Sequence, residues 1–186
     1  MRFATVLALA GLIATPALAA ETVPVGPFTK VQLRGGGHVV VKHGAPQRVT
    51  LLKGSTERTR LRIRNGNELV IDACQGLCFG RYDLEIEIVT PELDGAAIDG
   101  GGEIVAQSGF PSRDHFAAAV NGGGDIDIHA ISAKSVDAAV NGGGDIVLTA
   151  THDLNAAVSG GGDITYHGNP QVSEAVEGGG SVSAAR

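Results

Sequence analysis

One ten-residue pattern recurs along this chain of 186 residues. It consists of an opening residue that is usually alanine, then an aliphatic residue, a polar residue, three glycines, a second polar residue and an alternating stretch of three residues. Copies begin at Gln32, Ala97, Ala119, Ala139, Ala157 and Ala175. The last five glycine triplets start at positions 100, 122, 142, 160 and 178, so the steps between them are 22, 20, 18 and 18 residues. A repeat near twenty residues indicates a protein built from stacked turns of chain, which we call coils.

The residues around each triplet indicate strands. Val120, Ile126 and Ile128 are apolar, whereas Asp125 and Asp127 are polar, which is the alternation with period two that strands require. Three consecutive glycines are costly in a helix but suit a sharp corner with positive φ. The leucine-rich and helical consensus of other repeats of this length is missing. A parallel β-helix therefore fits best, with corners at Gly35, Gly100, Gly122, Gly142, Gly160 and Gly178.

Energetics also favour a stack. A coil offers roughly five aliphatic side chains worth ~1.5–3 kcal/mol each when buried, against ~1–2 kcal/mol of backbone entropy per residue, so a lone coil is unstable. Coils bonded rung to rung at about 4.8 Å share one apolar interior. We expect one inward column before the corner, formed by Ile98, Val120, Val140, Val158 and Val176. The column after the corner is expected to contain Ile104, Ile126, Ile146, Ile164 and Val182.

The first twenty residues have the composition of a secretory signal. Arg2 precedes an apolar run and then A-L-A, which predicts cleavage after Ala19 or Ala20. A membrane anchor is the alternative, but the apolar run is short and no stop-transfer charges follow it. No later run is long enough to span a bilayer. We expect an exported chain, periplasmic or secreted, with one domain over 21–186, irregular over 21–92 and built of glycine-triplet coils over 93–186.

Charge and composition restrict the partners. Without Arg2 the chain has 13 basic and 20 acidic residues, a net charge of −7, which disfavours nucleic acid and anionic lipid. Tryptophan is absent, which disfavours an aromatic platform for sugars. The spacing C-x3-C of Cys74 and Cys78 predicts a disulfide in an oxidising compartment, since a redox pair favours C-x-x-C and a zinc site needs more ligands.

The N-terminal third predicts strands without triplets between them. They are expected over 28–33, 39–41, 49–52, 60–64, 68–72 and 82–89, with a hairpin turn at Asn65-Gly66. Two strands carry outward charges of opposite sign. Either these rows face each other on neighbouring strands or each is solvated independently, and neither is expected to be catalytic. The rows are Arg60, Arg62 and Arg64, and Asp83, Glu85 and Glu87.

A polar residue follows each corner. These residues are Glu103, Asp125, Asp145, Asp163 and Ser181. In coils that are in register, the acids lie about one rung apart and neighbours repel by about 0.8 kcal/mol in water. Two arrangements would offset this repulsion. Each acid accepts N–H bonds at its own turn, or Asp125, Asp127 and Asp145 hold a weak Ca²⁺ site. The order G-G-G-D departs from the calcium-binding nonapeptide repeat.

Other polar residues are expected to be structural. Asn121, Asn141 and Ser159 precede the corner and can form a side-chain ladder along the stack. His129 and His167 share a repeat position two rungs apart, which predicts too large a separation for one ion. All six histidines are expected on the surface without metal-ligand spacing. They are His38, His43, His115, His129, His152 and His167.

No sequence motif indicates catalysis. G-x-S-x-G, H-E-x-x-H and the P-loop are all missing. Some β-helix enzymes cleave polysaccharides with carboxylates and a basic residue on one face. Here no Lys or Arg occupies the repeat positions beside the acidic column. We therefore expect no enzymatic activity and no cofactor, with a carbohydrate-active enzyme as the alternative.

Several motifs occur in an order that points to a known family. They are the export signal, F-x-x-V-x-L from Phe28, L-x-I-R-N-G-N-E-L-V-I from Leu61, V-T-P-E-L from Val89 and the serial G-G-G-D-I units. In this order the chain resembles the autotransporter adhesin head GIN domain family over nearly all of its mature length. The resemblance implies a right-handed, single-stranded β-helix and a role in adhesion or binding, without catalytic residues. The C-x3-C loop and the regular G-G-G-D run depart from the family pattern.

The combined prediction is an exported, non-enzymatic β-helix module with an adhesion, binding or structural role at the cell envelope. Its partner is an envelope or extracellular ligand that the sequence does not name, and no oligomeric state is indicated. Alongside the carbohydrate-active enzyme, a Ca²⁺-stabilised extracellular module is a further alternative.

Overall fold

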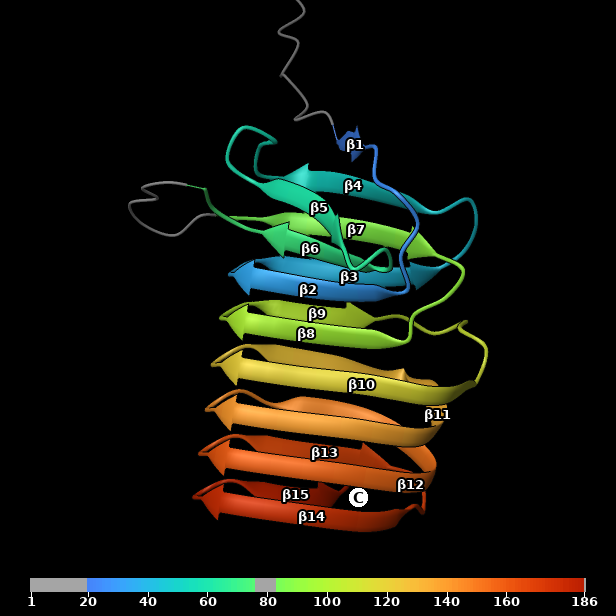
Figure 1. Ribbon diagram of the computed structural model, residues 1–186, viewed down its shortest axis with the longest axis vertical. Coiled ribbons are helices and arrows are strands. Elements are labelled where there is room, and N and C mark those ends of the chain that lie inside the picture. The colour runs from blue at the N-terminus through green and yellow to red at the C-terminus, as the bar shows by residue number, and fades with distance from the viewer. Residues whose placement is uncertain (1–19, 76–82, 186) are drawn as a thin grey trace, which may run out of the picture.

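The computed structural model describes residues 20–75 and 83–185, which form one sheet of 15 strands and no helix. The all-β prediction is therefore confirmed. The strands lie in layers along the long axis of the molecule (Figure 1). Their bounds are β1 Glu21–Val23, β2 Lys30–Gly35, β3 His38–His43, β4 Arg48–Lys53, β5 Arg60–Arg64, β6 Glu68–Asp72, β7 Glu85–Thr90, β8 Gly95–Gly100, β9 Glu103–Ala106, β10 Arg113–Gly122, β11 Asp125–Gly142, β12 Ile146–Gly160, β13 Asp163–His167, β14 Gln171–Gly178 and β15 Ser181–Ala184.

Every strand pair between the glycine-triplet coils is parallel, and both predicted columns are confirmed. Before the corner, Val120 pairs with Ile98 above and Val140 below, and the row continues in register through β12 and β14. After the corner, Ile126 pairs with Ile104 and Ile146, and the row continues through β13 and β15. Both columns are buried as far as β12 and β13. In the last coil they become more exposed, because no further coil covers them.

The N-terminal part makes the sheet mixed. β2 pairs in parallel with β6 and β8, and β3 pairs in parallel with β7 and β9. In contrast, β1 and β7 both pair antiparallel with β4, and β5 pairs antiparallel with β6. The predicted hairpin between β5 and β6 is confirmed, with φ of 52° at Asn65 and 77° at Gly66. The sequence does not predict the antiparallel pairs of β4, because a purely local pattern carries no strand direction.

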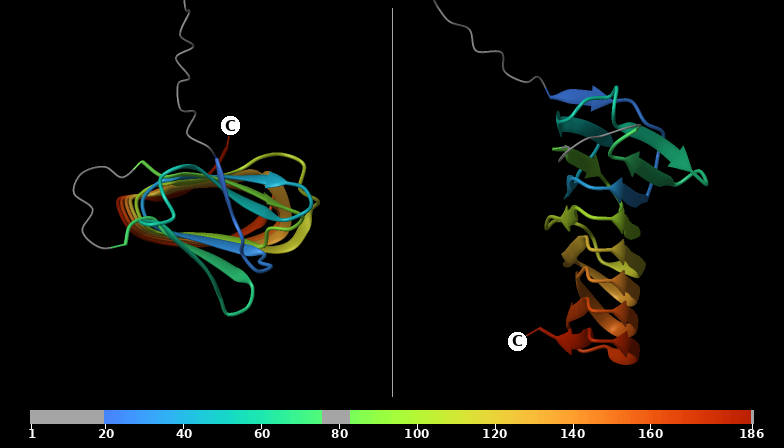
Figure 2. Two further views of the ribbon diagram at one scale, coloured as in Figure 1. Left: turned by 90° about the horizontal axis from the view of Figure 1, so that it is seen from above. Right: turned by 90° about the vertical axis from the view of Figure 1, so that its left-hand side faces the viewer.

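The coils enclose a single core. Aliphatic side chains from the two long faces meet inside it, from Val31 near the top to Ile164 in the last coils. From above, the coils overlap around a flattened, nearly closed outline, and the β5–β6 hairpin projects from it (Figure 2). Each coil thus buries its apolar residues against its neighbours and across the interior, as expected if a single coil cannot be stable alone.

The triplet glycines lie one above another along one edge. Gly142 has φ of 132°, and a Cβ there would lie 2.2 Å from the carbonyl oxygen of Gly122. A Cβ on Gly144 would lie 2.0 Å from the oxygen of Gly124, whereas a Cβ on Gly143 would meet nothing within 4 Å. A side chain at the first or third glycine of this triplet would therefore clash with the backbone of the neighbouring coil, whereas one at the middle glycine would not.

Two predictions concern residues outside the described ranges. The signal peptide, residues 1–20, falls almost wholly within 1–19, and the Cys74–Cys78 disulfide involves Cys78. In the described part of the chain, no helix has the length and apolarity that crossing a membrane requires.

Candidate functional site

An outward-facing row of alanines runs down one face of the stack, half-buried in its first two members and exposed in the last three. Its members are Ala97, Ala119, Ala139, Ala157 and Ala175, which pair in register from β8 to β14. Each alanine immediately precedes an inward member of the first column, so strand alternation turns its methyl group outward. The sequence signal is the alanine that opens each of these five repeat copies.

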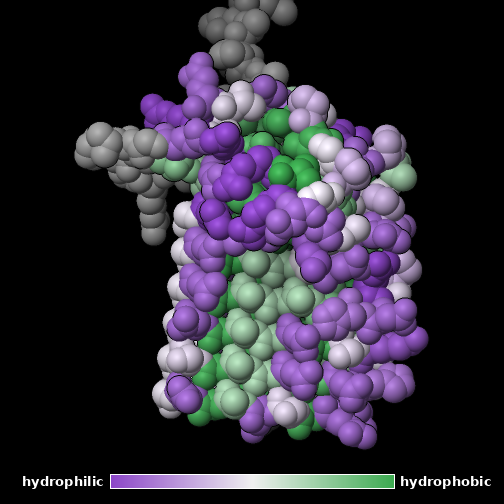
Figure 3. All heavy atoms as spheres, viewed as in Figure 1, coloured by the Kyte–Doolittle hydropathy of each residue, from purple (hydrophilic) through white to green (hydrophobic). Residues whose placement is uncertain are grey.

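This row forms the floor of a groove with a volume of about 630 Å³. A second outward row lies beside it and contributes Gly95, Ala117, Asp137, Asn155 and Ser173 to the lining, and Lys30 and Glu68 line the upper end. Figure 3 shows the groove as a pale green band with hydrophilic residues on both sides. Because methyl groups are short and the flanking side chains are longer, the face is hollowed along the stack.

Asp99 joins three polar side chains near the upper end of this face. It accepts hydrogen bonds from Gln32 Nε2 at 2.6 Å and from Asn121 Nδ2 at 3.0 Å, and Arg34 Nε lies 3.4 Å from its carboxylate. Asn141 and Ser159, the other expected ladder members, follow Asn121 in register. Asp99 thus joins the first glycine-triplet coil to the coils above and below it.

The corner acids are joined by hydrogen bonds from coil to coil. Asp125 Oδ1 accepts from the backbone N–H of Asp145 at 3.1 Å, and Asp145 Oδ1 accepts from that of Asp163 at 2.9 Å. Asp163 Oδ1 accepts from Ser181 Oγ at 2.7 Å. The expectation that each acid bonds its own turn is wrong for these residues, because each bonds the corner of the following coil. These donors offset the repulsion between stacked carboxylates.

The three calcium candidates do not converge. Asp125 and Asp145 bond the next corner, whereas Asp127 accepts from the backbone N–H of His129 at 3.1 Å and contacts its ring Nδ1. Within residues 20–75 and 83–185, no three His, Cys, Asp or Glu side chains are arranged to hold a metal ion. The geometry therefore gives the Ca²⁺ alternative no support.

One pair of histidines lies much closer than expected. The ring centroids of His129 and His167 are 5.7 Å apart, so the prediction that they are too far apart to share an ion is wrong. Asp127 pairs with Val147 and Ser132 pairs with Thr149, so β11 advances by five residues where its partner β12 advances by two. This bulge has three extra residues in β11, and His129 lies within it. The signal in the sequence is the 20-residue step at this coil, against 18 in the next.

The two charged rows of the N-terminal part do not face each other. Arg62 and Arg64 pair with Asp72 and Glu68 across the hairpin, at 3.1 and 2.8 Å. The acidic row pairs elsewhere, as in the 2.9 Å contact of Glu85 with Lys53. A side-chain hydrogen bond to Lys53 lowers the pKa of Glu85 below its ordinary value, as expected for an exposed ion pair.

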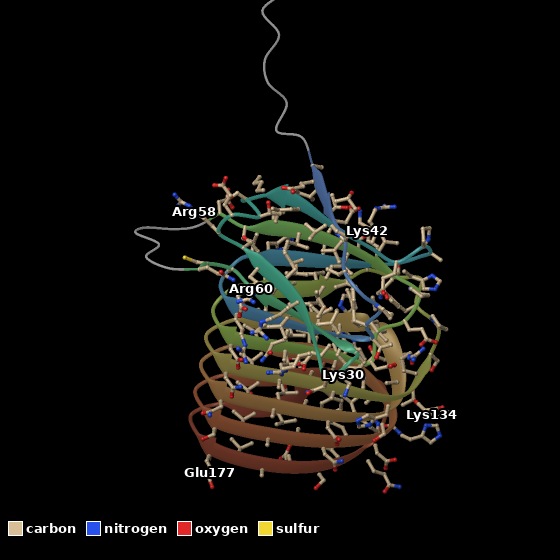
Figure 4. The ribbon with its side chains drawn as sticks, turned by 45° about the horizontal axis from the view of Figure 1, so that its top comes forward. Lys30, Lys42, Arg58, Arg60, Lys134 and Glu177 are labelled. Carbon is tan, nitrogen blue, oxygen red and sulfur yellow. The ribbon has the colours of Figure 1, made fainter. Side chains whose placement is uncertain are left out.

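Charge is distributed unevenly along the stack. Residues 21–92 contain ten Lys and Arg against eight Asp and Glu, and residues 93–186 contain three against twelve, so the net charges are +2 and −9. In Figure 4, Lys42, Arg58 and Arg60 lie in the N-terminal part and Glu177 lies at the opposite end. The groove therefore lies mainly in the acidic part of the molecule.

Comparison with known proteins agrees with this architecture. Residues 92–170 match the family model described as "Putative auto-transporter adhesin, head GIN domain". The match begins just before β8 and ends before β14, so the matched residues contain most of the alanine row and the regular corners. The resemblance seen in the sequence is thus confirmed over these residues. No curated protein matches the chain.

One solved structure has a similar fold. The chain is similar to a "putative adhesin" from Bacteroides fragilis NCTC 9343, with a TM-score of 0.58, 18% identity, and coverage of 92% of this chain and 98% of that one. A "putative adhesin" from Parabacteroides merdae ATCC 43184 has a TM-score of 0.46 and 14% identity, with 90% and 96% of the two chains covered. At this identity the likeness concerns the fold alone.

Proposed function

We propose that this chain is an exported, non-enzymatic binding module of the cell envelope, and that its head GIN domain holds an elongated partner along the alanine groove. The coils are proposed to wind as a right-handed, single-stranded β-helix. The groove is the observation that carries the proposal, because it is an exposed, weakly polar trough that extends over five coils. The names of the family and of the similar structure, both adhesins, are in keeping with it.

The groove suits binding by shape. Alanine side chains have no rotamers to lose, and strands bonded on both sides hold them in place, so a partner meets a preformed surface. Each methyl group contributes little alone, and a useful affinity therefore needs contact over several rungs. The charge of −9 over residues 93–186 favours a neutral or basic partner over an anionic one.

Filling the groove tests this proposal. Ala139→Arg places a long, charged side chain on the groove floor, in the middle of the row. Thr165→Arg adds the same charge on β13, at a half-buried position outside the groove lining. Binding of the purified variants to envelope fragments of the source cells would be measured by sedimentation. Ala139→Arg should lose binding and Thr165→Arg should keep it, with similar melting temperatures for both.

Equal binding by the two variants would contradict a role for the groove. The carbohydrate-active alternative makes a different prediction, namely the release of new reducing ends from envelope polysaccharide. Such release by the wild-type chain would replace a binding module with an enzyme.

A further inference from the structure

Two imidazole rings from separate coils meet on the outer surface of the strands that follow the corners. His129 belongs to β11 and His167 ends β13, and their centroids are 5.7 Å apart with an interplanar angle of 41°. Both residues are exposed, and the His129 side chain retains 51% of its accessible surface. The rings are therefore open to an ion from solvent.

A carboxylate orients one of the rings. Asp127 Oδ1 contacts His129 Nδ1, and it also accepts from the backbone N–H of His129 at 3.1 Å. A neutral imidazole that donates its Nδ1–H to this carboxylate has the Nε2 lone pair free. Metal-binding histidines commonly have this carboxylate–imidazole arrangement, which fixes the tautomer and makes the free nitrogen a better ligand.

The spacing of the rings suits a shared ion. With metal–nitrogen distances of about 2.0–2.1 Å, two imidazoles on one tetrahedral ion have centroids about 5 Å apart. The 5.7 Å separation is close to that value, so a small rotation of exposed side chains would complete the pair. His129 lies within the bulge between Asp127 and Ser132, where the regular pairing of β11 with β12 is interrupted.

We propose that His129 and His167 together bind one late first-row divalent metal ion, Zn²⁺ or Cu²⁺, with Asp127 positioning His129. Imidazole nitrogen suits these ions, and Cu²⁺ binds more tightly than Zn²⁺ in the usual order of divalent affinities. No third His, Cys, Asp or Glu in the described part of the chain completes the set, so the other coordination positions are open to water or to a partner. The acidic coils attract cations to this surface.

A titration with the metal alone tests the site. CuCl₂ or ZnCl₂ would be added to the purified chain in a calorimeter, and nitrogen hyperfine splitting from bound Cu²⁺ would be recorded by electron paramagnetic resonance. One ion per chain and a spectrum with two nitrogens are expected. Replacing either histidine, as His129→Ala or His167→Ala, should weaken binding at least about tenfold. Asp127→Asn should weaken it by about 10–100-fold, the usual effect of losing a carboxylate that orients a ligand.

His115 provides the matched control. It also lies beside a carboxylate, with Nε2 3.5 Å from Asp137 Oδ2 and a side chain that is 53% exposed. His115→Ala should therefore leave the titration unchanged. The proposal would be overturned if His115→Ala lost as much metal binding as His129→Ala. It would also be overturned if both His129→Ala and His167→Ala kept their metal binding. Unchanged melting of each variant without metal would show that the exposed substitutions leave the fold intact.

Discussion

Replacing one glycine of a triplet should strongly destabilise the stack, while replacing its neighbour should not. In Gly144→Ala, the new Cβ would lie 2.0 Å from Gly124 O, 2.8 Å from Val120 Cγ1 and 2.9 Å from Gly124 N. Two of these atoms belong to the backbone of the coil above and cannot rotate away. In Gly143→Ala the new Cβ would meet nothing within 4 Å. The two variants have the same composition and differ only in their distance from the next coil.

The cost of Gly144→Ala can be worked out from these contacts. Cβ atoms essentially never approach other atoms to less than 3.0 Å, so the coils must separate by roughly 1 Å at the corner. That separation breaks the bond from Gly144 N to Gly122 O, now 3.2 Å, and the neighbouring bond from Gly143 N to Gly122 O, now 2.9 Å. Two bonds at about 0.5–1.5 kcal/mol each and overpacking at about 1–3 kcal/mol give a loss of roughly 2–6 kcal/mol. That loss is a large part of a typical stability of about 5–15 kcal/mol.

Thermal and urea unfolding followed by circular dichroism would measure the difference. Gly144→Ala should melt about 5–20 °C lower than wild type, at about 2–4 °C per kcal/mol for a chain of this size. Gly143→Ala should melt within about 2 °C of wild type or slightly higher, because alanine restricts the unfolded chain. Equal unfolding midpoints for the two variants would refute the argument that close approach between coils sets the glycine requirement.

Three further predictions concern the core, the corner acids and pH. Val140→Ala should cost about 1–3 kcal/mol in urea unfolding because the side chain is 2% exposed, and Val176→Ala should cost less because that side chain is 41% exposed. Asp145→Ala removes the acceptor for the backbone N–H of Asp163 and should lower the free energy of unfolding by about 1 kcal/mol. If N–H donors of this kind satisfy the acid column, the melting temperature of the wild type should not respond to EDTA or Ca²⁺. The hydrogen bond with Lys53 holds the pKa of Glu85 below its ordinary value, so this ion pair should stabilise the fold above the pH range in which an ordinary Glu titrates and lose that contribution as pH falls through the lowered pKa. Melting of Glu85→Gln and wild type should therefore converge at low pH, and a difference that persists there would contradict this assignment.

The accuracy of the sequence predictions depends on how local each feature is. Strand alternation around Val120 and Val140 identifies inward residues without knowledge of their neighbours. The glycine triplet that recurs in each coil then places those residues in register. The hairpin at Asn65-Gly66 is local in the same sense. The antiparallel pairs of β4 depend on which strands meet, and no pattern within β4 specifies that.

The candidate site was harder to predict for a related reason. The alanine row is present in the sequence, but alanine is common both inside and outside proteins, and only its alignment over five coils makes a groove. To predict that His129 and His167 lie close together, one would have to compare the coil lengths of 20 and 18 residues and place the extra residues in one bulge.

The sequence by itself determined the repeat, the strands, the inward columns and the edge where the chain turns, because alternation and glycine corners act over a few residues. Tertiary structure alone decided which glycines touch the next coil, which carboxylates bond which corner and how near the two histidines come. Those features depend on distances between coils, and residues that meet across coils are about twenty or more positions apart in the chain.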